Sequence, residues 1–388
     1  MILTKPARIL YLINSLGAGG TERQLIYLLS QLDRHYFEPI VVTLYNDKLI
    51  VYHYRPELLA LNIPIYSLNH SSGIFGRIKA LLRYIYLIWH FRPQIVQGCL
   101  HYANLIARVS RPFCPSHKLI TSARAAYLPG EIRSEAYTHW LDTCLIVNSP
   151  HIREQMLQNT RRPAHKIQVI LNGLPLEDFA ENYQPDLRQR LFPEATCVIG
   201  VIGRIAAQKD HLTLIEALHL CQDEWPEKLA VFFLGDIAEP EIYQQIIQRI
   251  EAYDLQNIIH ILEKTANVAP YYHACDFTVL PSLYEGFPNV VLESFAAGKP
   301  VMLSDEANRS GIVEDEVTGW QFPVGDAPAL ASGLQKAWNT PQTSFQSMGQ
   351  QASLTAQRYS VESMVTQYTR LYNSLRHSKS SNWKGLNG

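Results

Sequence analysis

The 388-residue sequence lacks the features that would place it in several simple classes. Its six cysteines form no CxxC pair and no close group with histidines, which argues against a zinc site and favours free thiols in a reducing compartment. Its net charge is close to zero, at −1, and 47% of its residues are apolar. This composition predicts a globular chain rather than a disordered one. We expect no nucleic-acid partner.

A long hydrophobic run is missing as well. The first apolar stretch, residues 9–13, is short and runs into a glycine-containing turn, which indicates a strand rather than a secretory signal. The most apolar helical stretch, residues 80–91, contains Arg83 and is too short to span a bilayer. We therefore expect a cytoplasmic protein that is at most peripheral on the inner face of the cytoplasmic membrane.

Charge is present but unevenly distributed. Residues 1–175 hold 19 Lys+Arg and 9 Asp+Glu, whereas residues 176–388 hold 15 and 26. A basic half joined to an acidic half predicts that the first half meets an anionic partner, with a merely uneven solvated surface as the alternative.

Apolar, β-branched runs alternate with amphipathic helical patterns along the whole chain, and the pattern occurs twice. Such alternation predicts an α/β protein with parallel sheets, here two doubly wound Rossmann-like domains facing across a cleft. The expected strands are residues 8–13, 39–43, 63–67, 95–97, 118–121, 143–147, 167–170, 198–203, 229–234, 258–261, 277–280 and 300–303.

The length of the chain also predicts two domains. The expected divisions are a first domain at 1–175, a proline-containing hinge at 176–194, a second domain at 195–358, a helix at 359–376 that returns to the first domain, and a disordered tail at 377–388.

Three motifs fall on loops at the carboxyl ends of expected strands, where open parallel sheets bind ligands. The first, residues 15–22, contains Gly19 and Gly20 and favours a phosphate at a helix start, although a tight strand-to-helix turn explains it nearly as well. The second carries Arg204 and Lys209, two cations that can clamp a diphosphate. A bare pair of cations is most often a surface feature, but the position of this pair after a strand favours a functional role.

The third motif is the carboxylate pair Glu285 and Glu293, eight positions apart around the start of an expected helix over 289–297. Two carboxylates beside a phosphate cradle suit a sugar-nucleotide site. A glycoside hydrolase with an acid and a base is the alternative, which is less favoured because it needs neither the cation pair nor the glycine turn.

These stretches resemble the retaining glycosyltransferases of family four, glycosyl transferases group 1, which share the GT-B fold. The matching stretches are 14–24, 147–149, 169–173, 201–204 with Lys209, 231–235, 276–300 and 305–322. The resemblance covers nearly the whole chain and is stronger in the second half. It implies a retaining transfer of a sugar from a nucleotide diphosphate, with UDP as the expected carrier, to a glycan or lipid-linked acceptor in surface polysaccharide or lipopolysaccharide synthesis.

The resemblance also implies roles for individual residues. Arg204 and Lys209 would bind the donor diphosphate, Glu285 the donor sugar and Glu293 the ribose. Further donor-binding residues would be Gly19, Gly20, Gly286, Phe287, Asn289, Val290 and Val291. The expected catalytic residues are Arg204, Lys209, Glu285 and His101.

The histidine of the family does not carry over directly. Many members have His-x-His at the end of the fourth strand, where this chain has Gln97 and Cys99, with His101 two residues further on. His101 either takes the vacated place near the sugar or only caps and packs a helix start. No Asp-x-Asp stands at a strand end, so we expect no metal requirement and no cofactor.

Two other functions fit the same residues: another GT-B sugar-nucleotide enzyme, such as an epimerase, and a non-catalytic binding partner that keeps the fold. The charges on the helix with Arg77, Lys79, Arg83 and Arg92 permit contact with an anionic membrane. For the apolar stripe of that helix, Leu81, Leu82, Tyr84, Ile85, Leu87 and Ile88, we expect burial in the core.

Overall fold

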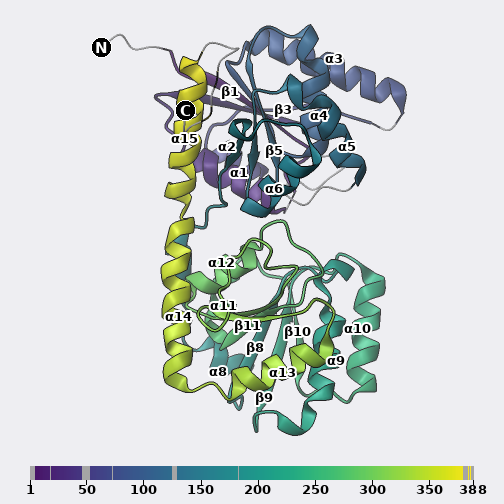
Figure 1. The fold of residues 1–388 in the computed structure, drawn as a ribbon, viewed down its shortest axis with the longest axis vertical. Coiled ribbons are helices and arrows are strands. Elements are labelled where there is room, and N and C mark those ends of the chain that lie inside the picture. The colour runs from purple at the N-terminus through teal and green to yellow at the C-terminus, as the bar shows by residue number, and fades with distance from the viewer. Residues whose placement is uncertain are drawn as a thin grey trace. The chain divides into compact units, whose positions relative to one another are not determined.

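A computed structural model describes residues 5–17, 19–45, 53–71, 73–124, 129–181 and 183–378, together with Trp383 and Gly385. The chain divides into two compact units, the first made of Met1–Gly173 with Val361–Gly388 and the second of Leu174–Ser360 (Figure 1). Each unit is a parallel sheet flanked by helices. The predicted α/β architecture with two doubly wound sheets is therefore confirmed.

The first unit contains a seven-stranded sheet with the order β3-β2-β1-β4-β5-β6-β7. Its strands are β1 (Ala7–Ile13), β2 (Phe37–Thr43), β3 (Ile65–Ser67), β4 (Ile95–Gly98), β5 (Lys118–Ala123), β6 (Cys144–Val147) and β7 (Ile167–Val169). The helices are α1 (Gly20–Gln31), α2 (Arg55–Ala60), α3 (Ile74–Phe91), α4 (His101–Ser110), α5 (Pro129–Thr138), α6 (Pro150–Asn159) and α15 (Val361–His377), with short 3-10 turns η1 (Arg111–Phe113), η2 (His139–Leu141) and η3 (Ala164–Lys166).

Both faces of this sheet are covered, which explains why its central strands are continuous apolar runs. On one face, Tyr11 packs with Leu25 of α1 and Tyr368 of α15. On the other, Leu10 packs with Tyr84 of α3. The C-terminal helix α15 thus belongs to the first unit.

The end of the chain differs in part from the predicted disordered tail. Residues 379–382, 384 and 386–388 lie outside the described residues. Trp383, however, is buried, and its indole N–H donates to the Ser374 hydroxyl over 2.8 Å. At this point the tail packs on the first unit because it supplies an aromatic ring to the α15 face of the core.

The second unit contains a six-stranded sheet with the order β10-β9-β8-β11-β12-β13. Its strands are β8 (Cys197–Ile202), β9 (Leu229–Leu234), β10 (Ile259–Leu262), β11 (Phe277–Leu280), β12 (Val301–Ser304) and β13 (Gly319–Phe322). The helices are α7 (Leu176–Glu181), α8 (Leu187–Leu191), α9 (His211–Leu220), α10 (Pro240–Ala252), α11 (Ala269–Ala274), α12 (Asn289–Ala296), α13 (Ala327–Trp338) and α14 (Gln342–Ala356), with 3-10 turns η4 (Ala207–Lys209), η5 (Gln222–Glu224) and η6 (Gln357–Tyr359).

The segment predicted as a hinge, residues 176–194, lies inside the second unit and forms α7 and α8. Arg188 of α8 makes two hydrogen bonds to Asp276, at 2.8 and 3.0 Å, and the same carboxylate accepts from the Val198 backbone N–H at 2.7 Å. These contacts tie α8 to the beginnings of β8 and β11. The unit boundary therefore falls between Gly173 and Leu174.

Candidate active site

The strand order of the second sheet reverses between β8 and β11. The chain leaves β8 toward β9 on one side, whereas β11 pairs with β8 on the other. The loops after these two strands therefore diverge, and ligands of doubly wound sheets bind in the crevice that such loops leave at the carboxyl ends. Arg204 and Lys209 lie on the loop after β8, and Glu285 lies on the loop after β11.

The structure joins these two loops directly. The Lys209 Nζ donates to Glu285 Oε1 over 2.6 Å, and both side chains are largely buried. Beside this pair, the Leu283 N–H donates to the Gln208 carbonyl at 2.9 Å, and the Gln208 side-chain amide donates to the Tyr284 carbonyl at 2.8 Å. Two of the predicted catalytic residues are thus in contact, on two loops joined by one backbone–backbone and one side-chain–backbone hydrogen bond.

Glycines allow the loop after β8 to take this path. Gly203 has φ +155°, and a Cβ at Gly235 would lie 1.9 Å from the Gly203 carbonyl oxygen. Two further hydrogen bonds, from Gly203 N–H to Leu234 and from Ile205 N–H to Asp236, hold the loop against the end of β9. A side chain at position 235 would therefore displace the backbone next to Arg204.

Arg204 is exposed, and within the described part of the chain no hydrogen bond or ion pair holds its guanidinium. The structure places it on the same loop as Lys209 without bringing it into contact with Glu285. Its predicted diphosphate role thus depends on an exposed side chain, in contrast to the Lys209–Glu285 pair, whose two groups are in contact.

The predicted phosphate-binding backbone is the start of α12. No side chain caps this helix, whose N-cap residue is Pro288. The Val291 N–H bonds to the Pro288 carbonyl at 3.0 Å, and the Phe287 ring packs at 5.7 Å from Tyr359. Phe287 and Val291 are buried, whereas Gly286, Asn289 and Val290 are partly exposed.

Glu293 lies within α12 and is only 3% exposed. Its Oε2 accepts a hydrogen bond from the Tyr272 hydroxyl of α11 at 2.8 Å. The carboxylate predicted to hold a ribose is therefore positioned by a tyrosine that sequence reasoning missed. Tyr272 lies 21 positions away on a different helix, and no spacing rule connects the two residues.

In the first unit, Gly19 and Gly20 begin α1, while Ala18 lies outside the described residues. A Cβ at Gly19 would lie 2.1 Å from Glu22 Oε2, so the Glu22 carboxylate is packed against the backbone of this turn. Burial raises the pKa of the Glu22 carboxyl, against the opposing effects of its own backbone N–H and of Arg124. An anion at this helix start would meet that carboxylate, which the predicted phosphate role did not take into account.

His101 is the first residue of α4, directly after β4. The Ser134 hydroxyl lies 2.9 Å from the Glu131 carbonyl and 3.2 Å from His101 Nε2, so it can hold the imidazole in place. Gln97 and Cys99, at the positions of the family's histidines, are both buried.

Gln97 is buried and accepts a hydrogen bond from the Tyr372 hydroxyl of α15 at 2.7 Å. The Cys99 thiol is also buried, and burial raises its pKa to about 12, which leaves it protonated and unreactive. The cysteines of the chain are all free, as predicted.

A buried ion cluster, Arg108, Arg162, Glu135 and Asp142, orients the helix that contacts His101. The Arg108 guanidinium binds Glu135 through two hydrogen bonds of 2.7 and 2.8 Å, and Arg162 Nη1 lies 2.5 Å from Asp142 Oδ1. All four side chains are nearly inaccessible. The cluster joins α4 to α5, which carries Ser134. The four residues are far apart in sequence, and no motif predicts them.

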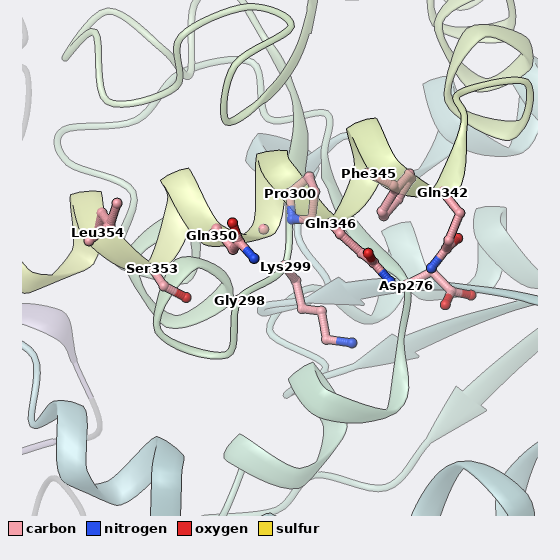
Figure 2. Close-up of a pocket in the computed structure, with 11 residues that line it drawn as sticks. Asp276, Gly298, Lys299, Pro300, Gln342, Phe345, Gln346, Gln350, Ser353 and Leu354 are labelled. Carbon is pink, nitrogen blue, oxygen red and sulfur yellow. The ribbon is translucent and has the colours of Figure 1, made fainter.

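A pocket of about 690 Å³ lies elsewhere in the second unit (Figure 2). It is bounded by α14 and by Asp276, Lys299 and Pro300, which precede β11 and β12. It is therefore at the amino ends of the strands, away from the Lys209–Glu285 pair. Within the part of the chain that the structure describes, no three His, Cys, Asp or Glu side chains gather as a metal ion would require. None of the described helices is long and apolar enough to cross a bilayer.

Comparisons with known proteins concern the family and the fold of the chain. Residues 183–354 match the family model of glycosyl transferases group 1. The chain is 28% identical over 259 residues to the putative glycosyltransferase EpsD of Bacillus subtilis, an alignment that spans 64% of each protein. It is 24% identical over 336 residues to the N-acetylgalactosamine-N,N'-diacetylbacillosaminyl-diphospho-undecaprenol 4-alpha-N-acetylgalactosaminyltransferase of Campylobacter jejuni, covering 83% of this chain and 88% of that one.

Solved structures show the same fold. HepE of Anabaena, crystallised in complex with UDP, superimposes with a TM-score of 0.82 at 20% identity, over 95% of this chain and all of that one.

Proposed function

We propose, from the membership of this chain's second unit in the glycosyl transferases group 1 family and from its GT-B fold, that the protein transfers a sugar from a nucleotide diphosphate to an acceptor. The acceptor is a glycan or a lipid-linked sugar in the synthesis of a surface polysaccharide or lipopolysaccharide. The donor is a UDP-sugar.

The contact between Lys209 and Glu285 carries this proposal. The ammonium nitrogen and the carboxylate oxygen lie 2.6 Å apart, close enough for one group to contact the phosphate and the other the sugar of the same sugar–phosphate bond. The ammonium can bind a phosphate oxygen while the carboxylate accepts hydrogen bonds from sugar hydroxyls. The pair is largely buried, so the attraction of the ammonium for a phosphate is screened less than it would be in open solvent.

Three features support compensation of the charge that develops on the leaving diphosphate. Lys209 is fixed at the switch point, Arg204 is available on the same loop, and the start of α12 has no capping side chain. Positive groups aimed at developing negative charge lower the barrier of such a reaction without a metal ion. We accordingly propose a metal-independent transfer, which a chelator should leave at its original rate.

The relatives support the choice of substrates. The Campylobacter jejuni relative is named for a diphospho-undecaprenol acceptor, and the Anabaena structure contains UDP. We propose retention of the anomeric configuration, which NMR of the first-formed product determines directly. A product with the opposite configuration to the donor would contradict this part of the proposal.

A thermal-shift screen with UDP-, GDP- and ADP-sugars tests the donor. A ligand present at 100 times its Kd stabilises the unit that binds it by about 2.7 kcal/mol. For a unit of this size, we expect the transition of the second unit to rise by roughly 5–10 °C with the preferred UDP-sugar and to stay in place with the free sugar. No shift with any nucleotide sugar, together with no release of nucleotide diphosphate, would contradict the proposal.

A further inference from the structure

The two faces of α3 differ from the predicted arrangement of that helix. Tyr84, Leu87 and Ile88 are buried, as expected. Leu82, expected in the same buried stripe, is 61% exposed. The prediction was wrong for Leu82 because the helix has a second apolar stripe on the side away from the sheet.

This outward stripe contains six large apolar side chains. They are Ile74 (69% exposed), Phe75 (86%), Ile78 (49%), Leu82 (61%), Tyr86 (63%) and Trp89 (52%). With 3.6 residues per turn, these positions fall within roughly 120° of the helix circumference, along a helix about 27 Å long. Monomeric soluble proteins seldom expose a contiguous apolar surface of this kind without a binding partner.

The outward stripe is flanked by cations. Lys79 and Arg83 lie along one side of it, and all the charged side chains of α3 are basic. The Trp89 indole N–H donates to the Phe113 carbonyl of η1 at 3.0 Å, so the chain beside the stripe carries a further apolar residue that is 62% exposed. No acidic residue occurs between positions 58 and 130 of the sequence.

This combination of groups determines the kind of partner. An apolar stripe with basic flanks and no acid matches an anionic lipid bilayer, in which apolar side chains enter the interface while Lys and Arg contact headgroups. A second copy of the chain fits poorly, since a symmetric contact would place the cations of one α3 against those of the other.

We propose that the outward surface of α3, together with Phe113, docks the protein on an anionic lipid bilayer. Phe75, Ile78, Leu82 and Trp89 enter the interface, and Arg77, Lys79, Arg83 and Arg92 contact the headgroups. This surface is separate from the Lys209–Glu285 site and does not depend on the transfer reaction.

Vesicle co-sedimentation of the full chain tests the proposal. Vesicles of phosphatidylglycerol mixed with phosphatidylcholine are compared with vesicles of phosphatidylcholine alone, at about 0.1 M salt, where charges still act over about 10 Å. The double variant Phe75→Ser with Leu82→Ser should reduce the partition coefficient by at least about ten-fold, given the apolar area that it removes. The variant Arg77→Gln, Lys79→Gln, Arg83→Gln should reduce it on the order of 100-fold, at about five-fold for each cation.

A matched control carries Leu59→Ser and Arg161→Gln, exposed residues of the first unit outside α3, and should bind like the parent. Because all the substituted side chains are exposed, every variant should keep the parent melting temperature. The proposal is overturned if the parent does not sediment with the anionic vesicles, or if the Phe75, Leu82 variant partitions like the parent. A stable dimer in sedimentation velocity that the same variant dissociates would assign the surface to a second copy instead.

Discussion

The buried ion cluster allows a sharp prediction about stability. Arg108 contacts two carboxylates, Glu135 and Asp142, and Arg162 contacts the same two. The cluster is neutral as a whole. Arg108→Met keeps an apolar side chain of similar length but leaves two buried negative charges facing one positive charge.

The magnitude follows from the burial of the cluster. Removing one partner from a fully buried ion pair typically costs about 3–5 kcal/mol, because the remaining charge is neither solvated nor compensated. Here the Thr121 and Thr138 hydroxyls, which also contact Arg108, lose a partner too. In a unit of about 200 residues, such a loss lowers the melting temperature by on the order of 10 °C.

Acid should weaken the effect. Burial alone would raise the pKa of Asp142, but Arg162 and Arg108 outweigh it and hold that pKa below its usual value. A carboxylate with a lowered folded-state pKa stabilises the fold above its unfolded pKa of about 3.9, and this contribution is lost as the pH falls further. The cost of Arg108→Met should therefore be smaller near pH 3 than at pH 7.

Calorimetry of the full chain at pH 7 measures the effect, since it can resolve the transitions of the two units. The matched control is Arg161→Met, an exposed arginine beside the buried Arg162, which should change the free energy of unfolding by less than about 0.5 kcal/mol. If Arg108→Met melts within 2 °C of the parent, the buried ion cluster does not stabilise the first unit by the expected amount.

Two further predictions concern the second unit. Gly235→Ala should weaken UDP-sugar binding by about ten-fold or more, because the added Cβ would lie 1.9 Å from the Gly203 carbonyl oxygen. Isothermal titration measures the affinity. The control is Gly130→Ala, where an added Cβ meets no atom within 4 Å. Burial, with a smaller effect of Lys209, lowers the pKa of His211 to about 4, so the fold loses stability as the pH falls from about 6.5 toward 4. His211→Leu should therefore recover about 2 kcal/mol of this loss at pH 5 in urea titrations, whereas exposed His35→Leu should recover none.

Much of the fold could be predicted because parallel strands that are buried on both faces consist of continuous apolar residues. Every predicted strand is present, with ends that differ by one or two residues. β13, at the edge of its sheet, was missed because the alternation Gly319 to Phe322 is short and contains Gln321. The hinge was misplaced because proline and polar residues mark a surface segment, while the ion pair Arg188–Asp276 that joins this segment to the second unit leaves no local pattern.

The sequence predicts some features of the candidate site and not others. The loops after β8 and β11 were predictable, since glycines and charges follow recognisable strands, and the structure brings Lys209 and Glu285 together. The contacts Tyr272–Glu293 and His101–Ser134 join residues from separate helices, which only tertiary packing places side by side. The roles of Gly19, Gly20 and His101 in substrate binding stay predictions.

The most direct test of the central claim compares Glu285→Ala and Lys209→Ala with the parent in two assays, transfer of sugar from the preferred UDP-sugar and binding of UDP. Glu285→Ala should lose most of its transfer activity while binding UDP nearly as well as the parent, because the carboxylate is assigned to the sugar. Lys209→Ala should weaken both, because the ammonium is assigned to the diphosphate. Transfer at the parent rate by Glu285→Ala would contradict the account.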